Sequence, residues 1–476
     1  MKNTNKFLLL SLVALLLASC NGYLKKEPRA LLTTDKVFSD SAGVISVLAA
    51  SYRHLHRFEY YGRDMMLMGD VLADNAAIAI NTGRYVTHIN NQLFSHFNFW
   101  SGAPYEAVNE ANFVIEATDD TKILMSDRLR ARLKAEALFI RALCHHDLAR
   151  VYSYEPANAG GFNLGVVIRD KPTRGVSDAD GAKRATVAET YDFIIKDLQD
   201  AIALFSTIPN EAFPRRANQA AAEALLARVY LYAGRFADAA DAADAAMSTL
   251  SSQAAPTAVL TTTANHVSSF ATATHPESIF EIDIGPADWS TVDGVNNSLA
   301  SWTRSPSSFL PLPGPGPVYA IKASNTLNGL IVAPDVRRNL WSSAGECGKW
   351  RGEKGNFVEN VPVIRYAELL LISAEGRARS GGEAAALTSL NQLVTNRGLT
   401  ALNLSGLALI DEIMRQRRIE FAFEGHRWFD MKRLGLPIPK DPAQGAALSA
   451  SDSRLLSFIP TSETGVNPNL VQNPGY

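Results

Sequence analysis

Apolar residues recur at intervals of three and four along several long stretches of this chain. The longest such stretch is 127–151, and its apolar stripe consists of Leu133, Ala137, Ile140, Cys144, Leu148 and Val151. This spacing places all of them on one face of a helix and predicts a single continuous amphipathic α-helix. Alanine-rich patterns of the same kind elsewhere in the sequence indicate a mainly α protein.

Two further stretches have the pattern of paired helices joined by glycine. In 217–247, Gly234 is placed to end the first helix in a left-handed conformation, and a run of small residues follows it. The stretch 362–396 has the same arrangement, with Gly381 and Gly382 at the turn. Helix, glycine turn and helix with small inward-facing residues are typical of tetratricopeptide-like repeats. Because the repeats are degenerate and discontinuous, we expect a scaffold of tetratricopeptide-like helical pairs and not a regular solenoid.

The region 251–360 has a different texture, rich in Thr, Ser, Pro, Gly and Asn, and it includes the proline-glycine run 311–317. Proline and glycine at this density exclude long helices, so we predict a loop-rich irregular subdomain with little β structure. One short strand is expected at 280–284, where apolar and acidic residues alternate. Long loops in compact proteins are usually functional. The region also holds four of the six tryptophans, Trp289, Trp302, Trp341 and Trp350.

A predicted helix at 407–425 carries charged residues on its apolar face. Arg417, Glu420 and Glu424 share that arc with the apolar residues Ile410, Ile413, Met414 and Phe421. Charges that point into a core must be paired, because an isolated buried charge costs several kcal/mol or more. One interpretation is a catalytic carboxylate pair. The favoured one is structural, namely an ion-pair and cap network that fixes the turn at Gly425 and docks Arg427, Trp428, Asp430 and Arg433.

Composition narrows the functional classes. The 476 residues are 47% hydrophobic, which suffices for a large core, and the formal net charge is -2. Near-neutral charge argues against a nucleic-acid partner, because phosphate binding requires a concentrated basic surface. Beyond the N-terminal segment only Cys144 and Cys347 remain, and two distant thiols do not form a disulfide framework. We expect both to be unpaired, although one bridge is possible.

The N-terminus has the pattern of a bacterial lipoprotein signal. Lys2 and Lys6 precede an apolar run that closes on Leu-Ala-Ser-Cys at 17–20. The run is too short to span a bilayer and has the flanks of a removable secretion signal. We therefore predict a signal peptide at 1–19, a lipidated Cys20 and a tether at 20–32. An ordinary signal with an incidental cysteine is the alternative.

The C-terminal residues 415–433, RQRRIEFAFEGHRWFDMKR, resemble the signature of the SusD/RagB outer-membrane lipoproteins of Bacteroidetes. Residues 364–375 resemble the helix that precedes this signature, and 467–476 resemble the usual terminus of the family. Trp100, followed by Tyr105 and by Ala111-Asn112, resembles a signature of the N-terminal half. Two features depart from the family, since Gln416 stands where Glu is frequent and no acidic run follows Cys20.

The resemblance implies a helical scaffold that carries a loop-rich ligand face. Such proteins cover a SusC-like TonB-dependent barrel and help deliver glycans, or in some members peptides, to it. It therefore implies a lipid-anchored nutrient-binding protein of the outer membrane, facing the cell exterior, without a cofactor and without enzyme activity. We expect an N-terminal SusD-like helical region at 33–250, the ligand-face region at 251–360 and a C-terminal RagB/SusD-like region at 361–476.

Sugars bind by stacking on aromatic rings while amides, carboxylates and arginines bind their hydroxyls. Two loops offer these groups. The first is 75–91, with Asn81, Arg84 and Tyr85, and SusD-like ligand residues commonly lie in the corresponding stretch. The second is the tryptophan-bearing region, which offers a platform of Trp289, Trp302 and Tyr319 with polar contacts from Asn296 and Asn297. Each aromatic also has a structural interpretation as half-buried packing, and Trp100 and Trp428 are predicted to be core residues.

Other functional classes find less support in the sequence. An exported glycan-acting enzyme could use Asp64, Asp70 and Asp74 as paired carboxylates, but Asp70 and Asp74 are spaced as residues that cap a helix end. Adjacent His145 and His146 point to different faces of a helix, so a metal site is not expected there. The pair His54 and His56 fails in the same way. A scaffold that binds the barrel but no ligand remains a third class.

Overall fold

The computed structural model describes residues 34–92, 96–97, 99–158, 161–175, 181–209, 214–253, 257–288, 297–305, 318–352, 354–355 and 358–476. The predicted signal peptide, Cys20 and the tether lie outside these ranges. Trp289, Asn296 and the proline-glycine run 311–317 also lie outside them, so the structure tests none of these predictions.

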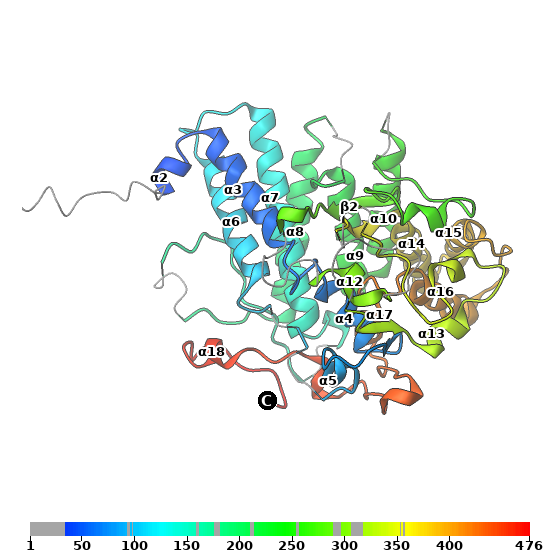
Figure 1. Cartoon of the computed structure of the whole chain (residues 1–476). Coiled ribbons are helices and arrows are strands. Elements are labelled where there is room, and N and C mark those ends of the chain that lie inside the picture. Colours follow the sequence, from blue (N-terminus) through cyan, green and yellow to red (C-terminus); the bar gives the residue numbers. More distant parts are fainter. Residues whose placement is uncertain are drawn as a thin grey trace, which may run out of the picture.

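Long helices form one side of the molecule and pack against one another in sequence order (Figure 1). Helix α7 pairs with α6 and α8, α9 pairs with α8 and α10, and α14 then packs on α10, α15 and α16. The expectation of a mainly α scaffold of helical pairs is confirmed. The bounds of these helices are α3 (Ser41–His54), α6 (Ala103–Asp119), α7 (Asp127–Tyr152), α8 (Val187–Phe205), α9 (Gln219–Tyr232), α10 (Phe236–Ser251), α14 (Tyr366–Arg379), α15 (Glu383–Thr395) and α16 (Gly406–Glu420).

The predicted glycine turns join the helical pairs. Gly234 between α9 and α10 has φ +73°, and Gly381 between α14 and α15 has φ +92°. Both angles lie in the left-handed region that glycine adopts without steric cost. Helices α10 and α14 cross closely, because a Cβ at Gly376 would lie 2.5 Å from the backbone oxygen of Phe236. Small residues at this crossing therefore set how near the two pairs approach.

Two short antiparallel sheets connect the loop-rich region to the rest of the chain. Strand β1 (Ala76–Ile78) pairs with β3 (Ile321–Ala323), and β2 (Ser278–Ile282) pairs with β4 (Val361–Arg365). The strand predicted at 280–284 exists but begins two residues earlier. All five of its residues are buried. The acidic residue of the alternating pattern, Glu281, therefore points into protein and not into water, where it accepts a hydrogen bond from Asn360.

The remaining described helices are short, as the texture of 251–360 predicted. In that region they are α11 (His266–Ser269), η3 (Pro286–Asp288), α12 (Leu299–Thr303), α13 (Asn325–Leu330) and η5 (Val336–Leu340). Elsewhere they are α2 (Thr34–Val37), α4 (Asp64–Val71), α5 (Val86–Ile89), η1 (Pro156–Asn158), α17 (Arg427–Arg433), η6 (Pro442–Gln444), η7 (Ser453–Leu455) and α18 (Thr461–Thr464).

The helix predicted at 407–425 ends earlier than expected, at Glu420. The next residues form a turn in which Phe423 and Gly425 have φ values of 64° and +79°. This turn lies directly on α4, since a Cβ at Gly425 would stand 2.1 Å from the backbone oxygen of Met65. The sequence pattern predicted a longer helix because apolar residues continue after Glu420. These residues are buried by the contact with α4 and do not form another helical turn.

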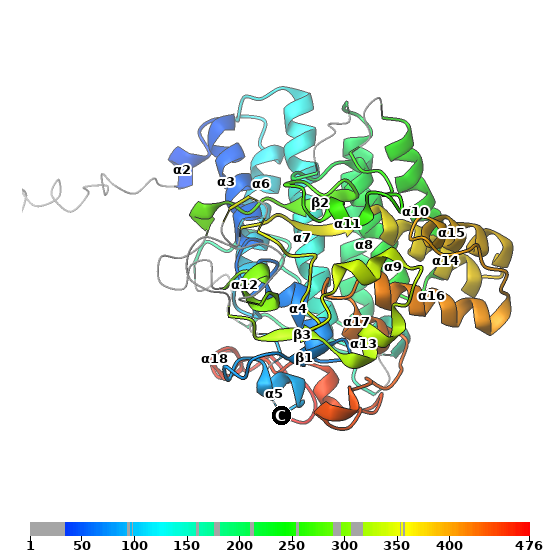
Figure 2. The same cartoon turned by 45° about the vertical axis from the view of Figure 1, so that its right-hand side comes forward.

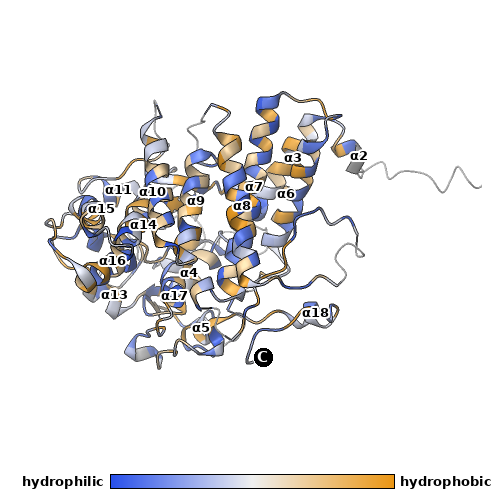
Figure 3. Ribbon diagram, turned by 180° about the vertical axis from the view of Figure 1, so that it is seen from behind, coloured by the Kyte–Doolittle hydropathy of each residue, from blue (hydrophilic) through white to orange (hydrophobic). Residues whose placement is uncertain are grey.

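The long helices carry both hydrophobic and hydrophilic residues, coloured orange and blue in Figure 3. In the part of the chain that the structure describes, none of the helices has the length and apolar character needed to cross a membrane. Trp100 and Trp428 are 3% and 1% exposed, which confirms that both are core residues. Cys144 and Cys347 are buried and unpaired, as expected.

Candidate functional site

The two loops predicted to bind ligand lie against each other. The pairing of β1 with β3 continues past the strands, because the backbone nitrogen of Ile80 donates to the oxygen of Tyr319 over 3.1 Å. The nitrogen of Tyr319 donates in turn to the oxygen of Ser301 in α12 over 2.9 Å. Residues more than 200 positions apart in sequence thus form one surface, near β1, β3 and α12 in Figure 2.

Aromatic and guanidinium groups of the two loops contact one another at this junction. The ring centroids of Tyr85 and Trp302 are 4.6 Å apart. The guanidinium carbon of Arg63 lies 4.0 Å from the centroid of the Trp302 ring, and that of Arg84 lies 5.6 Å from it. Three predicted ligand residues, Arg84, Tyr85 and Trp302, are therefore brought together. Arg63 joins them from the turn before α4.

Hydrogen bonds fix the orientation of these groups. Arg63 donates to Asp64 over 2.7 Å and to Asn297 over 2.8 Å, and the hydroxyl of Tyr85 donates to Asp64. Burial and the carboxylate of Asp64 raise the pKa of Tyr85 well above its ordinary value, which keeps the hydroxyl protonated as a donor. Burial disfavours the charged form of Arg63, whereas the carboxylate of Asp64, 2.7 Å from its Nε, favours it. The cluster is a preformed polar and aromatic base.

The first loop presents polar side chains to solvent, whereas the aromatic rings of the cluster are buried. Asn81 and Arg84 are exposed, whereas Tyr85, Trp302 and Tyr319 are 6%, 3% and 8% exposed. Asn81 is positioned by its own turn, where its side-chain oxygen accepts from the nitrogen of Gly83 over 3.1 Å. Of the predicted ligand residues in the described ranges, Asn81 and Arg84 are thus the two whose side chains are exposed. The platform of Trp302 and Tyr319 stays a prediction, with both rings largely covered.

The backbone at the junction adopts an uncommon conformation. Tyr85 and Tyr319 have φ values of 58° and 43°, in the left-handed region that residues with a bulky side chain rarely adopt. Such conformations cost on the order of 1–3 kcal/mol each and cluster at functional sites. The strain is found at two of the residues selected from sequence.

Sequence reasoning missed Arg63 as a member of this site. Its partners Asn297 and Trp302 lie more than 230 residues away, and nothing near Arg63 in the sequence indicates them. Asn297 was proposed as a polar contact, and its side-chain oxygen instead faces Arg63.

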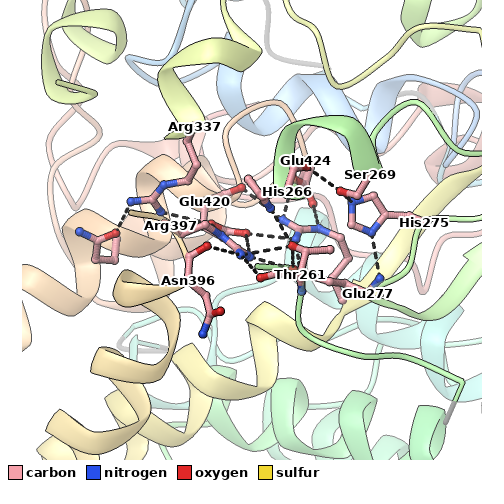
Figure 4. A network of polar contacts seen from close by, with 12 residues as sticks. Thr261, His266, Ser269, His275, Glu277, Arg337, Asn396, Arg397, Glu420 and Glu424 are labelled. Atoms are coloured by element: carbon pink, nitrogen blue, oxygen red, sulfur yellow. Dashed lines mark hydrogen bonds and ion pairs between the residues drawn. The ribbon is translucent and has the colours of Figure 1, made fainter. Parts of the chain in front are cut away.

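The charged residues of 407–425 enter a buried ion network (Figure 4). Glu420 accepts hydrogen bonds from Arg337, Arg365 and Arg397 over 2.9–3.1 Å, as Figure 4 shows in part. The network balances four cations against four anions, namely Arg337, Lys349, Arg365 and Arg397 against Glu277, Asp335, Glu420 and Glu424. None of these eight side chains is more than 7% exposed. The contacts fit the structural interpretation, because every carboxylate is occupied by arginine or lysine and out of reach of a substrate.

The electrostatics of this network favour the ionised form of Glu277 and Glu420 and the neutral form of the neighbouring His275. Burial favours protonation of Glu277 and Glu420, but Arg397 and Arg365 outweigh it and lower both pKa values. Burial lowers the pKa of His275 to about 4, and its two ring nitrogens contact Ser269 and the backbone nitrogen of Glu277. Gln416, which departs from the family signature, contributes its side-chain oxygen to Arg337 over 2.5 Å. The substitution thus removes a charge while it keeps a hydrogen bond.

The carboxylates considered for an enzyme are all engaged in structural contacts. Asp70 is fully buried and accepts from Asn75 and from the backbone of Gly425, and burial raises its pKa to about 6. Asp74 pairs with Arg427 at 2.9 Å and with Arg418 at 3.0 Å. The third carboxylate, Asp64, belongs to the aromatic cluster.

The histidines considered for a metal face separate environments, as their spacing predicted. His145 bonds the backbone of Arg141 and Arg169, whereas His146 packs edge-on against Tyr191 and Tyr232. Across the described ranges no group of three or more His, Cys, Asp or Glu is placed to hold a metal ion.

Comparisons with known proteins cover almost the whole chain. Residues 23–231 match a family described as starch-binding and associating with the outer membrane, and residues 348–476 match the SusD family. SusD-like protein P2 of Formosa agariphila is 26% identical, over 97% of this chain and 98% of that protein.

Solved structures of the same superfamily have the same fold. A SusD superfamily protein from Bacteroides vulgatus superposes with a TM-score of 0.78 at 27% identity, over 92% of this chain and 99% of that one. A laminarin-binding SusD-like protein gives 0.72 at 20% identity, over 92% of this chain and all of that one.

Proposed function

We propose that this chain, which belongs to the SusD/RagB family, is a surface lipoprotein that captures glycans and delivers them to a SusC-like TonB-dependent transporter. Glycan binding in nutrient uptake is the activity that the family supports, and one related structure is that of a laminarin-binding protein. The observation that carries the proposal is the junction of the two candidate loops, where exposed Arg84 lies over the ring of Trp302, which packs on Tyr85, and exposed Asn81 belongs to the same loop as Arg84.

The chemistry of this junction suits a sugar better than other nutrients. Arg84 and Asn81 supply donors and an acceptor for hydroxyl groups, and the buried Tyr85–Trp302 pair gives the loop that carries them a rigid support. Ordering costs are low because Arg63, Asp64 and Tyr85 are already locked together. A peptide-binding member of the same uptake system is the alternative, since amide and guanidinium groups also bind peptide carbonyls.

The first experiment is a binding panel with the soluble protein that begins after Cys20. Laminarin, starch, xylan, mannan and pectin would be included in native gels, and retarded migration would identify the ligand. We expect one glycan to retard the protein and its chain length to stay unchanged after overnight incubation. Shortened glycan products from a clean preparation would contradict the assignment as a binding protein. If none of the five polysaccharides retards the protein, the proposal that its ligand is a glycan is wrong.

The site itself is tested by Arg84→Ala and Asn81→Ala. Both side chains are exposed, so we expect an unchanged melting temperature and an affinity reduced at least about tenfold by the loss of charged and neutral hydrogen bonds. Arg338→Ala is the matched control, because Arg338 on η5 is also an exposed arginine and is not one of the predicted ligand residues. Equal affinities of all three variants would place the ligand elsewhere.

Delivery to a transporter needs the native membrane. The full-length protein with Cys20 intact would be tagged at its C-terminus and purified after gentle solubilisation. Co-purification of a large outer-membrane barrel, lost in Cys20→Ala, is the expected result. A protein that elutes alone and is shielded from protease in intact cells would contradict both the partner and the outward orientation.

A further inference from the structure

A cleft of about 660 Å³ lies beside the N-terminal end of α6, and none of the residues that line it belongs to the loop junction. It is bounded by the start of α6, by residues 167–173 and 181–182, and by the C-terminal segment around α18. This volume is within the range of pockets that hold small ligands. The residues that matter for its chemistry are Trp100, Tyr105, Glu106, Arg169, Glu463 and Val466.

The cleft combines an anchored aromatic ring with charged groups of both signs. Tyr105 is half-buried, and its hydroxyl donates to the backbone oxygen of Val167 over 2.9 Å, which holds the ring in place. Trp100 packs against this ring at 5.9 Å in an edge-to-face arrangement. Two carboxylates, Glu106 and Glu463, and the guanidinium of Arg169 line the same space. An apolar ring surrounded by hydrogen-bonding groups is the arrangement that a pyranose requires.

The cleft and the loop junction are reached from a single turn of the chain. The backbone nitrogen of Gly62 donates to the oxygen of Arg57 over 3.0 Å, so Arg57 and Arg63 leave the same tight turn. Arg57 pairs with Glu106 of the cleft at 2.9 Å, whereas Arg63 lies over Trp302 of the junction. The cleft and the junction are therefore linked through one short turn of the chain, with one arginine directed to each. A ligand that contacts both sites at once is a polymer of several rings.

We propose that this cleft is a second glycan-binding site, occupied by another stretch of the polysaccharide chain that binds at Arg84. The inference rests on the proposed glycan-binding function and adds a second point of attachment to it. Two linked contacts raise the overall affinity for a polymer by a factor of about 10²–10⁴ over one contact alone. A short oligosaccharide, which reaches only one site at a time, gains nothing from this linkage.

The test uses a substitution at the mouth of the cleft. Val466 is 80% exposed and lines the cleft, so Val466→Arg fills the space without disturbing the core. Val471→Arg is the matched control, because Val471 is 52% exposed on the same segment and does not line the cleft. Both variants would be titrated with whichever of laminarin, starch, xylan, mannan or pectin binds the wild type, and with its trisaccharide.

The expected result is an affinity for the polysaccharide that falls at least about tenfold in Val466→Arg but not in Val471→Arg. Trisaccharide affinity at the junction stays within twofold of the wild type in both variants, and Arg84→Ala abolishes it. Equal polysaccharide affinities of the two valine variants would overturn the second site while the proposed function stands. An equal loss for polymer and trisaccharide in Val466→Arg would also overturn it, because one site would then account for all binding. A wild type that binds none of the five polysaccharides would refute the proposed function, and the second site with it.

Discussion

The buried network around Glu420 makes a strong prediction about stability. Substitution of Glu420 by Gln keeps the shape of the side chain but removes its charge. Its two oxygens accept four hydrogen bonds from Arg337, Arg365 and Arg397, and the glutamine amide offers a single acceptor oxygen and an NH2 group that faces guanidinium donors. The four cations of the network would then face three anions, leaving one uncompensated positive charge in a site without water access.

The expected loss of stability follows from the burial of Glu420 and its arginine partners. Removal of one partner from a buried ion pair typically costs about 3–5 kcal/mol. Unfolding entropy of roughly 2.1 cal/mol/K per residue gives about 1 kcal/mol/K for a chain of this length, if it unfolds as one unit. The melting temperature should therefore fall by about 3–5 °C.

Differential scanning calorimetry at pH 7.5 would measure this shift. Glu116→Gln is the control, because Glu116 pairs with Arg174 at a surface where both side chains are about half exposed, and surface pairs contribute about 0–1 kcal/mol. The double variant Arg397→Gln with Glu420→Gln restores the charge balance, so its destabilisation should be at least about 1 kcal/mol smaller than the sum of the single ones. A Glu420→Gln melting temperature within 1 °C of the control would refute the view that this network is a structural core of paired charges.

Three further perturbations test other parts of the structure. Burial lowers the pKa values of His146 and His275, so below pH 6.5 the unfolded state binds protons that the folded state does not. The free energy of unfolding should therefore be highest above pH 6.5. Below it, the free energy of unfolding should fall by about 1.4 kcal/mol per pH unit for each such histidine. Denaturant titrations at pH 7 and pH 5 should show this loss, and a smaller one in His146→Phe. Gly425→Ala should lower the free energy of unfolding by on the order of 3 kcal/mol or more, because its Cβ would lie 2.1 Å from a backbone oxygen. Gly406→Ala should lower it by about 1–2 kcal/mol, because Gly406 has a positive φ but open space around it. Equal melting temperatures of the two variants would contradict the close contact at Gly425. Cys144 and Cys347 are buried and unpaired, so reductant should leave the melting temperature of the soluble form unchanged and iodoacetamide should label them only after unfolding.

Local pattern determined which elements of this fold could be predicted. The stripe of 127–151 gave α7 to within one residue, and Gly234 and Gly381 marked the turns that the structure places there, because both signals depend on neighbours in sequence. The end of α16 was missed for the opposite reason. The residues after Glu420 stay buried by contact with α4, which lies about 350 positions earlier in the chain.

The candidate site shows the same division. Composition and loop position selected Arg84, Tyr85 and Trp302, and the structure brings these three together. Sequence could not show that Trp302 would be nearly covered, or that Arg63 would lie over its ring. Both facts follow from the pairing of β1 with β3, and a three-residue strand has too little pattern to indicate its partner.

Residues 415–433, which most clearly resemble the family, contact the start of the first candidate loop, 75–91. Arg418 donates to the side chain of Asn75 over 2.8 Å, and Arg427 pairs with Asp74 at 2.9 Å. Asp74 is also held from another side, because the hydroxyl of Ser324, the residue that follows β3, donates to its backbone oxygen over 2.6 Å. The first candidate loop thus begins from a point held at once by α16, by α17 and by the residue after β3. Charged contacts of this kind fix direction as well as distance. The C-terminal signature is therefore the support that orients the loop carrying Asn81 and Arg84, and its buried charges act on the proposed ligand residues through Asp74 and Asn75.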